Sequence, residues 1–200
     1  MYWTKNIAIV KEHNSYYLFN NLILYFMSYR KIVEFFRSGN ISAAKTALVE
    51  ALKNNALTTV EKVNILRTKS EALLESYVAA MKHRRPRQWE LMEIVHSGNI
   101  KVIESIEIDK FPVPVQKEML KLNNVEIFRH QFERHPNCKF CNKVDIFIIR
   151  SQDKQFAQAY VAINWLEKDA EEEVLASNDM ELIQAYFGKY NGMWRTSESI

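Results

Sequence analysis

Apolar and polar positions follow a pattern that recurs six times along this chain. Each copy centres on a short polar turn ending in Asn, Ser or Asp. One apolar pair lies four and five residues before that anchor, and another lies three and four residues after it. The six anchors are Asn40, Ser70, Asn99, Asn124, Asp153 and Asp179, and they are 25 to 30 residues apart. This recurrence predicts an internal structural repeat.

Each copy is predicted to be a helix, a tight turn and a second helix. The anchors are residue types that cap helix starts, because their side-chain oxygens accept hydrogen bonds from unpaired backbone N–H groups. Apolar residues three, four, seven and eight positions later form the stripe of an amphipathic helix. After Asn124, Gln131 interrupts this stripe once. The apolar pair before each anchor ends a shorter, earlier helix.

The position six residues after each anchor is expected to lie close to a neighbouring helix. Small side chains fill it in five of the six copies, namely Thr46, Ser76, Ser105, Ala159 and Ala185. The exception is His130, whose imidazole needs a separate explanation.

The repeats predict an all-α fold, an α-solenoid of six to seven helix-turn-helix units in a single domain, residues 1–200. One hairpin cannot bury its apolar face alone, whereas stacked hairpins can. The low count of 4 Gly and 4 Pro agrees with a chain of helices. Asn14 would anchor an N-terminal capping repeat over residues 1–30, although a short strand at residues 7–10 is the competing prediction.

Charge and hydropathy indicate a protein without a membrane span, expected in the cytoplasm and lacking a signal peptide. The most apolar stretch, residues 16–36, is interrupted by polar residues. A buried terminal repeat is the favoured interpretation, and an amphipathic helix that binds a membrane or a partner is the alternative. Residues 1–150 carry a charge balance of +8 and residues 151–200 one of −5. Solvated helix faces explain this polarity most simply, and attraction of an acidic partner is the alternative.

One cluster of candidate metal ligands contains both cysteines of the chain. It consists of His130, His135, Cys138 and Cys141, four nitrogen and sulfur donors within twelve residues. That number of donors fits one tetrahedral structural zinc, and the segment 133–143 would form an insertion loop that holds it. The sequence requires no cofactor, because free thiols without metal explain the cluster as well, and redox or disulfide chemistry is a third alternative.

A basic connector between the second and third copies is the candidate polyanion-binding segment. Pro86 prevents the preceding helix from continuing, which exposes the cations around it. Cations beside an aromatic side chain can bind phosphates and stack on a base. The candidate residues are Lys82, Arg84, Arg85, Arg87 and Trp89. A solvated connector without a ligand is the ordinary interpretation of such a short motif.

The turn and second helix resemble those of ankyrin repeats. Ser97-Gly98-Asn99-Ile100-Lys101-Val102-Ile103-Glu104 and Ser177-Asn178-Asp179-Met180-Glu181-Leu182-Ile183 carry this likeness. A degenerate ankyrin-like or HEAT-like array of helical hairpins implies protein–protein interaction through an extended surface. Signatures of catalytic or nucleotide-binding sites are absent from the sequence. We therefore expect a non-catalytic scaffold with a protein partner. A nucleic-acid-binding solenoid is the alternative, and a metal-dependent enzyme at the His/Cys cluster is a third.

Overall fold

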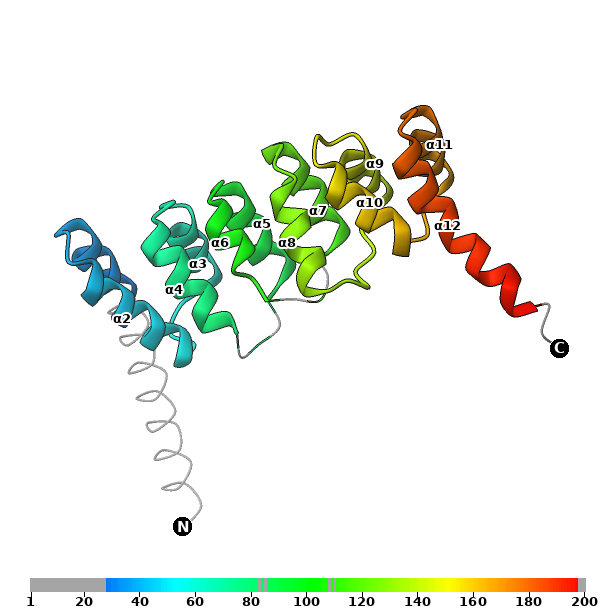
Figure 1. The fold of residues 1–200 in the computed structure, drawn as a ribbon. Coiled ribbons are helices and arrows are strands. Elements are labelled where there is room, and N and C mark those ends of the chain that lie inside the picture. Colours follow the sequence, from blue (N-terminus) through cyan, green and yellow to red (C-terminus); the bar gives the residue numbers. More distant parts are fainter. Residues whose placement is uncertain (1–27, 83, 85, 108, 110, 198–200) are drawn as a thin grey trace, which may run out of the picture. The chain divides into compact units, whose positions relative to one another are not determined.

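The computed structural model describes residues 28–82, 84, 86–107, 109 and 111–197. Within these ranges every regular element is helical and none is a strand (Figure 1). The predicted capping repeat around Asn14 and the alternative strand at residues 7–10 lie outside the described residues. Contacts within the chain define two compact units, Met1–Ser105 and Ile106–Ile200.

Unit 1 contains five helices after a helical segment at residues 28–37. They are α2 (Ile41–Lys53), α3 (Thr59–Leu66), α4 (Glu71–Met81), α5 (Gln88–His96) and α6 (Ile100–Glu104). Helix α4 packs against α2, α3 and α6, and α5 packs against α3 and α6. Second helices of successive pairs therefore contact one another, and so do the first helices α3 and α5.

Unit 2 repeats this arrangement with a more aromatic core. It contains α7 (Val113–Met119), the short 3₁₀ helix η1 (Leu120–Leu122), α8 (Glu126–Arg134), α9 (Asn142–Ile149), α10 (Lys154–Ile163), α11 (Lys168–Ala176) and α12 (Met180–Ser197). Helix α9 packs against α7, α10 and α11, while α12 packs against α10 and α11. The rings of Phe132, Phe140 and Phe156 pack around Tyr160 with centroids 5.5–6.1 Å away.

The apolar stripe predicted after each anchor forms the core. Side chains at the fourth position after the anchor are buried in five of the six copies, namely Ala44, Leu74, Ile103, Phe128 and Ala157. In the sixth copy Ile183 is half-buried. Tyr77, Tyr160 and Tyr186 are at most 1% exposed at the seventh position. Gln131 occupies that position after Asn124 and is buried as well. Its amide N–H₂ donates to the backbone carbonyl of Asp109 at 3.4 Å, which compensates part of the cost of burying a polar group.

The prediction for the sixth position after the anchor is not general, because only Ser76 is buried there and Ala185 is half-buried. Thr46, Ser105 and Ala159 are exposed there, and His130 is half-buried. Successive residues turn by about 100° around a helix, so this position lies roughly a third of a turn away from the buried stripe. Small side chains are tolerated at this position but not required, and His130 needs no special explanation.

The turns share a backbone geometry in addition to the caps. Anchor side chains accept the N–H three residues later at 3.1–3.2 Å for Asn40, Asn99, Asp153 and Asp179. Ser70 makes no such bond, and Asn124 instead accepts the N–H of Glu126 at 2.9 Å. The residue before the anchor has a positive φ in five turns, at Gly39, Lys69, Gly98, Asn123 and Asn178.

A hydroxyl two residues before the anchor completes five of the six turns. It donates to the carbonyl three residues earlier at 2.6–3.0 Å, from Ser38, Thr68, Ser97, Ser151 and Ser177. These bonds add a side-chain donor to carbonyls in the last turn of the first helix, where intrahelical partners run out. Sequence reasoning missed this hydroxyl, although aligning the six turns with one another would have found it.

Candidate functional site

The basic connector is organised around a buried carboxylate that sequence reasoning missed. Glu90, in the first turn of α5, is only 1% exposed. Its carboxylate accepts the Tyr77 hydroxyl at 2.6 Å and both terminal nitrogens of the Arg84 guanidinium, one of them at 2.6 Å. The backbone N–H of Arg87 donates to the same carboxylate at 2.9 Å. Four donors therefore hold one negative charge inside unit 1.

These hydrogen bonds determine the protonation of the network. Burial acts to raise the pKa of Glu90, but the hydrogen bonds from Arg84, Tyr77 and the backbone of Arg87 outweigh burial and lower it. Burial, reinforced by the bond to Glu90, raises the pKa of Tyr77. Glu90 is thus a carboxylate and Tyr77 a neutral phenol at neutral pH.

The connector residues divide into two groups. Arg84 binds Glu90 and holds the connector against α5, so it is a structural residue. Arg87 is exposed, Lys82 is exposed at the end of α4, and Trp89 is half-buried in the first turn of α5. Arg85 lies outside the described residues. Replacing Arg84 is therefore expected to affect folding, because a buried carboxylate depends on it.

Lys62 is a cation of this region that the sequence pattern did not reveal. It is half-buried on α3, which packs against α5. Burial lowers its pKa, and the guanidinium groups of Arg84 and Arg87 lower it further, while Glu90 opposes them. Lys62 therefore lies within electrostatic range of Glu90, Arg84 and Arg87, and these four groups comprise three cations and one carboxylate.

The predicted zinc ligands are distributed over the end of α8, the following loop and the start of α9. His130 is half-buried within α8, and His135 ends that helix with its Nδ1 at 3.8 Å from Asp109 Oδ1. Cys138 is buried, whereas Cys141 caps α9 and its backbone N–H donates to Gln116 Oε1 at 2.8 Å. The loop spans residues 135–141, two residues shorter at each end than predicted.

The described part of the chain contains no group of three or more His, Cys, Asp or Glu side chains arranged to hold a metal ion. Neither cysteine forms a disulfide. A structural zinc at His130, His135, Cys138 and Cys141 stays a prediction from the sequence.

Ion pairs link successive helical pairs at equivalent places in the two units. Arg67 directly follows α3 and binds Glu93 on α5 at 2.8 Å, and Arg150 directly follows α9 and binds Glu173 on α11 at 2.7 Å. The cation belongs to the earlier pair in both cases. Exposed pairs of this kind contribute little stability, so their main consequence is register between neighbouring turns.

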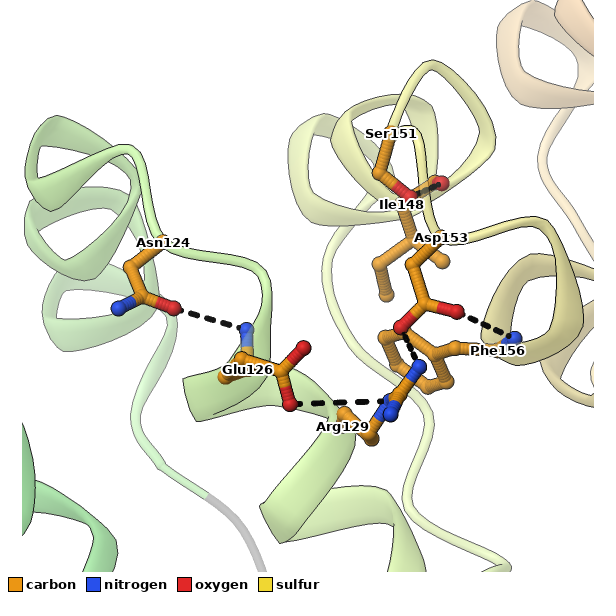
Figure 2. A network of polar contacts seen from close by, with 7 residues as sticks. All are labelled: Asn124, Glu126, Arg129, Ile148, Ser151, Asp153 and Phe156. Atoms are coloured by element: carbon orange, nitrogen blue, oxygen red, sulfur yellow. Dashed lines mark hydrogen bonds and ion pairs between the residues drawn. The ribbon is translucent and has the colours of Figure 1, made fainter.

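A second set of polar contacts in unit 2 links α8 to the turn before α10, and α10 to the turn before α12. Figure 2 shows Arg129 between Glu126 and Asp153, with its Nε 3.8 Å from Glu126 Oε2 and its guanidinium bonded to Asp153. Asp153 simultaneously caps α10 through the N–H of Phe156. Further along, Lys154 binds Asp179, the anchor of the next turn, at 2.8 Å.

A polar groove of about 300 Å³ lies between the turn α9–α10 and the turn α11–α12. Arg150 and Lys154 line it together with Glu173 and Asp179, which are their ion-pair partners. Because each cation of the groove is neutralised by one of its acids, the groove has no net charge with which to attract an ionic ligand.

Large apolar side chains reach the surface at the end of α10. Ile163 is 51% exposed and Trp165 is 48% exposed. Lys189 on α12 fixes this segment, since its ammonium donates to the carbonyls of Val161 at 3.1 Å and Asn164 at 2.6 Å. The same ammonium lies 4.9 Å from the Trp165 ring centroid and 3.7 Å from that of Tyr186. Burial lowers the pKa of Lys189 to about 8.

Across the residues that the structure describes, no helix is both long and apolar enough to cross a membrane. Comparison of the chain with protein-family models, curated proteins and solved structures finds no match.

Proposed function

We propose that this chain is a non-catalytic protein–protein interaction scaffold whose helical pairs continue as a degenerate ankyrin-like or HEAT-like α-solenoid. The packing of like helices supports this proposal, because α2, α4 and α6 follow one another in unit 1, as do α7, α9 and α11 in unit 2. The equivalent ion pairs Arg67–Glu93 and Arg150–Glu173 indicate that neighbouring pairs meet in the same register. A stack of this kind offers an extended surface rather than an enclosed reaction site.

The exposed apolar segment at Ile163 and Trp165 carries the proposal of a protein partner. Tryptophan is enriched among residues that dominate binding energy at protein interfaces. Here its ring is already held by Lys189, so binding would cost little side-chain conformational entropy. The polar groove between the neighbouring turns is internally neutralised, which leaves this apolar segment as the better-suited contact in unit 2.

Site-specific photo-crosslinking tests this function. A photoreactive amino acid replaces Ile163 in one variant and Gln155, an exposed residue of the same helix, in the control variant. Crosslinking of one defined protein from position 163, lost when Trp165→Ser is added, supports the proposal. Equal crosslinking from both positions, or no loss with Trp165→Ser, contradicts it.

Trp165→Ser and Ile163→Ser must leave the fold intact for this comparison. Both side chains are about half exposed, so far-ultraviolet circular dichroism should be unchanged. Val60→Ser is the matched surface control, because Val60 is 68% exposed on α3 in unit 1. Its partner binding should equal that of the wild-type protein.

A further inference from the structure

The buried network in unit 1 leaves an excess of positive charge at one place on the surface. Glu90 is the only carboxylate in its network, and its two oxygens already accept four donors from Tyr77, Arg84 and the Arg87 backbone. Three cationic side chains, Lys62, Arg84 and Arg87, interact with or lie beside that single negative charge. The local balance of these four groups is therefore positive.

Two of the three cations have no close ion-pair partner among the described residues. Among the described residues, neither Lys62 nor Arg87 forms an ion pair through its side chain. The acid next to Lys62 in sequence, Glu61, is engaged elsewhere, because its carboxylate accepts the backbone N–H and the hydroxyl of Thr58, both at 2.8 Å. Arg84 is held by Glu90 and cannot turn toward a ligand without leaving that carboxylate buried and uncompensated.

These two cations come from different elements and are held near each other by packing. Lys62 lies on α3, Arg87 immediately precedes α5, and α3 packs against α5. The Glu90 carboxylate fixes the backbone of Arg87 through its N–H. Burial is the main cause of the lowered pKa of Lys62, and Glu90 opposes it, while repulsion between Lys62 and the guanidinium groups of Arg84 and Arg87 lowers it further. An anion placed between them would relieve this repulsion.

We propose that Lys62 and Arg87 form a binding site for the phosphodiester backbone of a single-stranded nucleic acid, positioned by the Tyr77–Glu90–Arg84 network. Phosphates neutralise lysine and arginine with release of counterions, which gives affinity without sequence preference. Trp89, two residues from Arg87 and half-buried, supplies an aromatic side chain at the same helix start. Arg84 is a positioning residue of this site and Lys62 is a binding residue that the connector motif does not include. This proposal goes beyond the scaffold function and does not depend on it.

Titration with a fluorescein-labelled 12-nucleotide oligouridylate at 50 mM salt tests the site. The variant Lys62→Gln with Arg87→Gln keeps the length of both side chains and removes two charges. We expect the Kd to rise about tenfold or more and the slope of log K against log salt to become shallower by about 1.4, since each lost phosphate contact on a single strand contributes about 0.7. The matched control is Lys53→Gln with Lys101→Gln, two exposed lysines of unit 1 outside the cluster, which removes the same charge.

Comparing the two variants distinguishes a specific site at Lys62 and Arg87 from general attraction of the oligonucleotide to a positively charged protein. Unchanged binding in the control variant supports the proposal. An equal loss in both variants, or no measurable binding by the wild-type protein, overturns it. A polyglutamate peptide of equal charge provides a further arm: equal affinity for this peptide would assign the cluster to acidic proteins and overturn the nucleic-acid site. Circular dichroism of both variants should match the wild-type spectrum, since neither changes Arg84 or Glu90.

Discussion

The two units bury a carboxylate beside a tyrosine in two different ways. Tyr77 and Tyr160 occupy the same position, seven residues after an anchor, and each donates its hydroxyl to a buried acid at 2.6 Å. In unit 1 the acid is Glu90 on the following helix α5, and an arginine binds it from the connector. In unit 2 the acid is Asp145 on the preceding helix α9, and the tyrosine hydroxyl also accepts the N–H of Phe140 at 3.2 Å.

Two tyrosines at equivalent repeat positions therefore need not contribute equally to the stability of their units. Unit 1 uses a guanidinium, so the charge of its carboxylate is compensated and the tyrosine is one donor among four. In unit 2 the Tyr160 hydroxyl bonds both Asp145 and the Phe140 N–H, so removing it affects two buried partners at once. In unit 1, removing the Arg84 side chain should therefore cost more stability than removing the Tyr77 hydroxyl. Removing the Tyr160 hydroxyl in unit 2 should cost more stability than removing the Tyr77 hydroxyl in unit 1.

Arg84→Ala should produce the largest effect. It removes two hydrogen bonds and the counter-ion from a carboxylate that is 1% exposed. We expect a loss of about 2–3 kcal/mol in the free energy of unfolding, below the full cost of breaking a buried ion pair because the arginine itself is partly exposed. Urea denaturation measures it. Arg87→Ala is the control, since Glu90 binds only its backbone N–H, and a similar loss in both variants would contradict the model of the network.

Tyrosine to phenylalanine changes then compare the two networks directly. Tyr160→Phe should cost about 2 kcal/mol, because a buried carboxylate loses a donor and the Phe140 N–H loses an acceptor. Tyr77→Phe should cost only about 1 kcal/mol, because Arg84 and the Arg87 backbone continue to bind Glu90. Urea midpoints of both variants measure the difference. The reverse order would show that the arginine does not compensate Glu90.

The sequence predicted the helices and the core but not these networks. The apolar stripe recurs along the chain and four of the six anchors form the expected cap, so local periodicity was sufficient to place residues such as Leu182 and Asp153. Glu90 looked like an ordinary acid in a first helical turn. Its burial depends on Tyr77, 13 residues earlier, and on the path of the connector, which no local pattern encodes. One signal existed: Glu90 and Asp145 each lie four residues before a buried apolar residue, Ile94 and Ile149, on the same helix face.

The candidate sites were predicted less well, for the same reason. Composition located the basic connector, but it could not distinguish Arg84, which binds Glu90, from Arg87, whose side chain is exposed. Lys62 could not be found by proximity in sequence, because α3 and α5 meet only in the folded unit. Spacing alone placed four potential metal ligands in one segment, whereas the positions of their side chains depend on how α8 ends and α9 begins.

The pH dependence of stability tests the charge of Glu90. The pKa of this carboxyl is lowered in the folded state relative to its ordinary value of 4.5. Its contribution is therefore fully present above pH 4.5 and is lost as the pH falls through the folded pKa. The stability difference between the wild-type protein and Glu90→Gln should be constant from pH 5 to 7 and shrink at lower pH. A difference independent of pH down to 3 would contradict a charged, hydrogen-bonded Glu90.

A smaller effect tests whether the equivalent turns share the left-handed backbone conformation before the anchor. Gly98 and Lys69 both precede an anchor, with φ of +71° and +55°. A Cβ at Gly98 would meet no atom within 4 Å, so Gly98→Ala isolates the cost of the left-handed conformation, about 1 kcal/mol. Lys69→Gly should be neutral or stabilising by a few tenths of a kcal/mol, since glycine relieves the strain but loses backbone entropy. Thermal unfolding of both variants measures these effects, and destabilisation by Lys69→Gly would show that its side chain has another role.

The smallest effect concerns Lys189 in unit 2, whose half-buried ammonium binds carbonyls and rings, whereas Arg84 in unit 1 binds a carboxylate. The pKa of Lys189 is lowered to about 8 from 10.5 by burial, and Lys139 lowers it further while Glu171 opposes both. Between these two pH values the unfolded chain binds more protons than the folded one, so stability should rise with pH across that window.

Lys189→Met should abolish this rise in stability with pH. The rise is expected to be small, because the ammonium is partly exposed to solvent. Urea midpoints from pH 7 to 10 measure it as the difference between variant and wild type, which cancels groups that titrate in both. Lys154→Met is the control: its bond to Asp179 raises the pKa of Lys154, so that variant should run parallel to the wild type over the window. A Lys189→Met curve that is also parallel would mean that the ammonium is as well solvated in the folded unit as in the unfolded chain. The carbonyls of Val161 and Asn164 would then not hold a desolvated charge, and the contrast between the two units would be limited to their carboxylates.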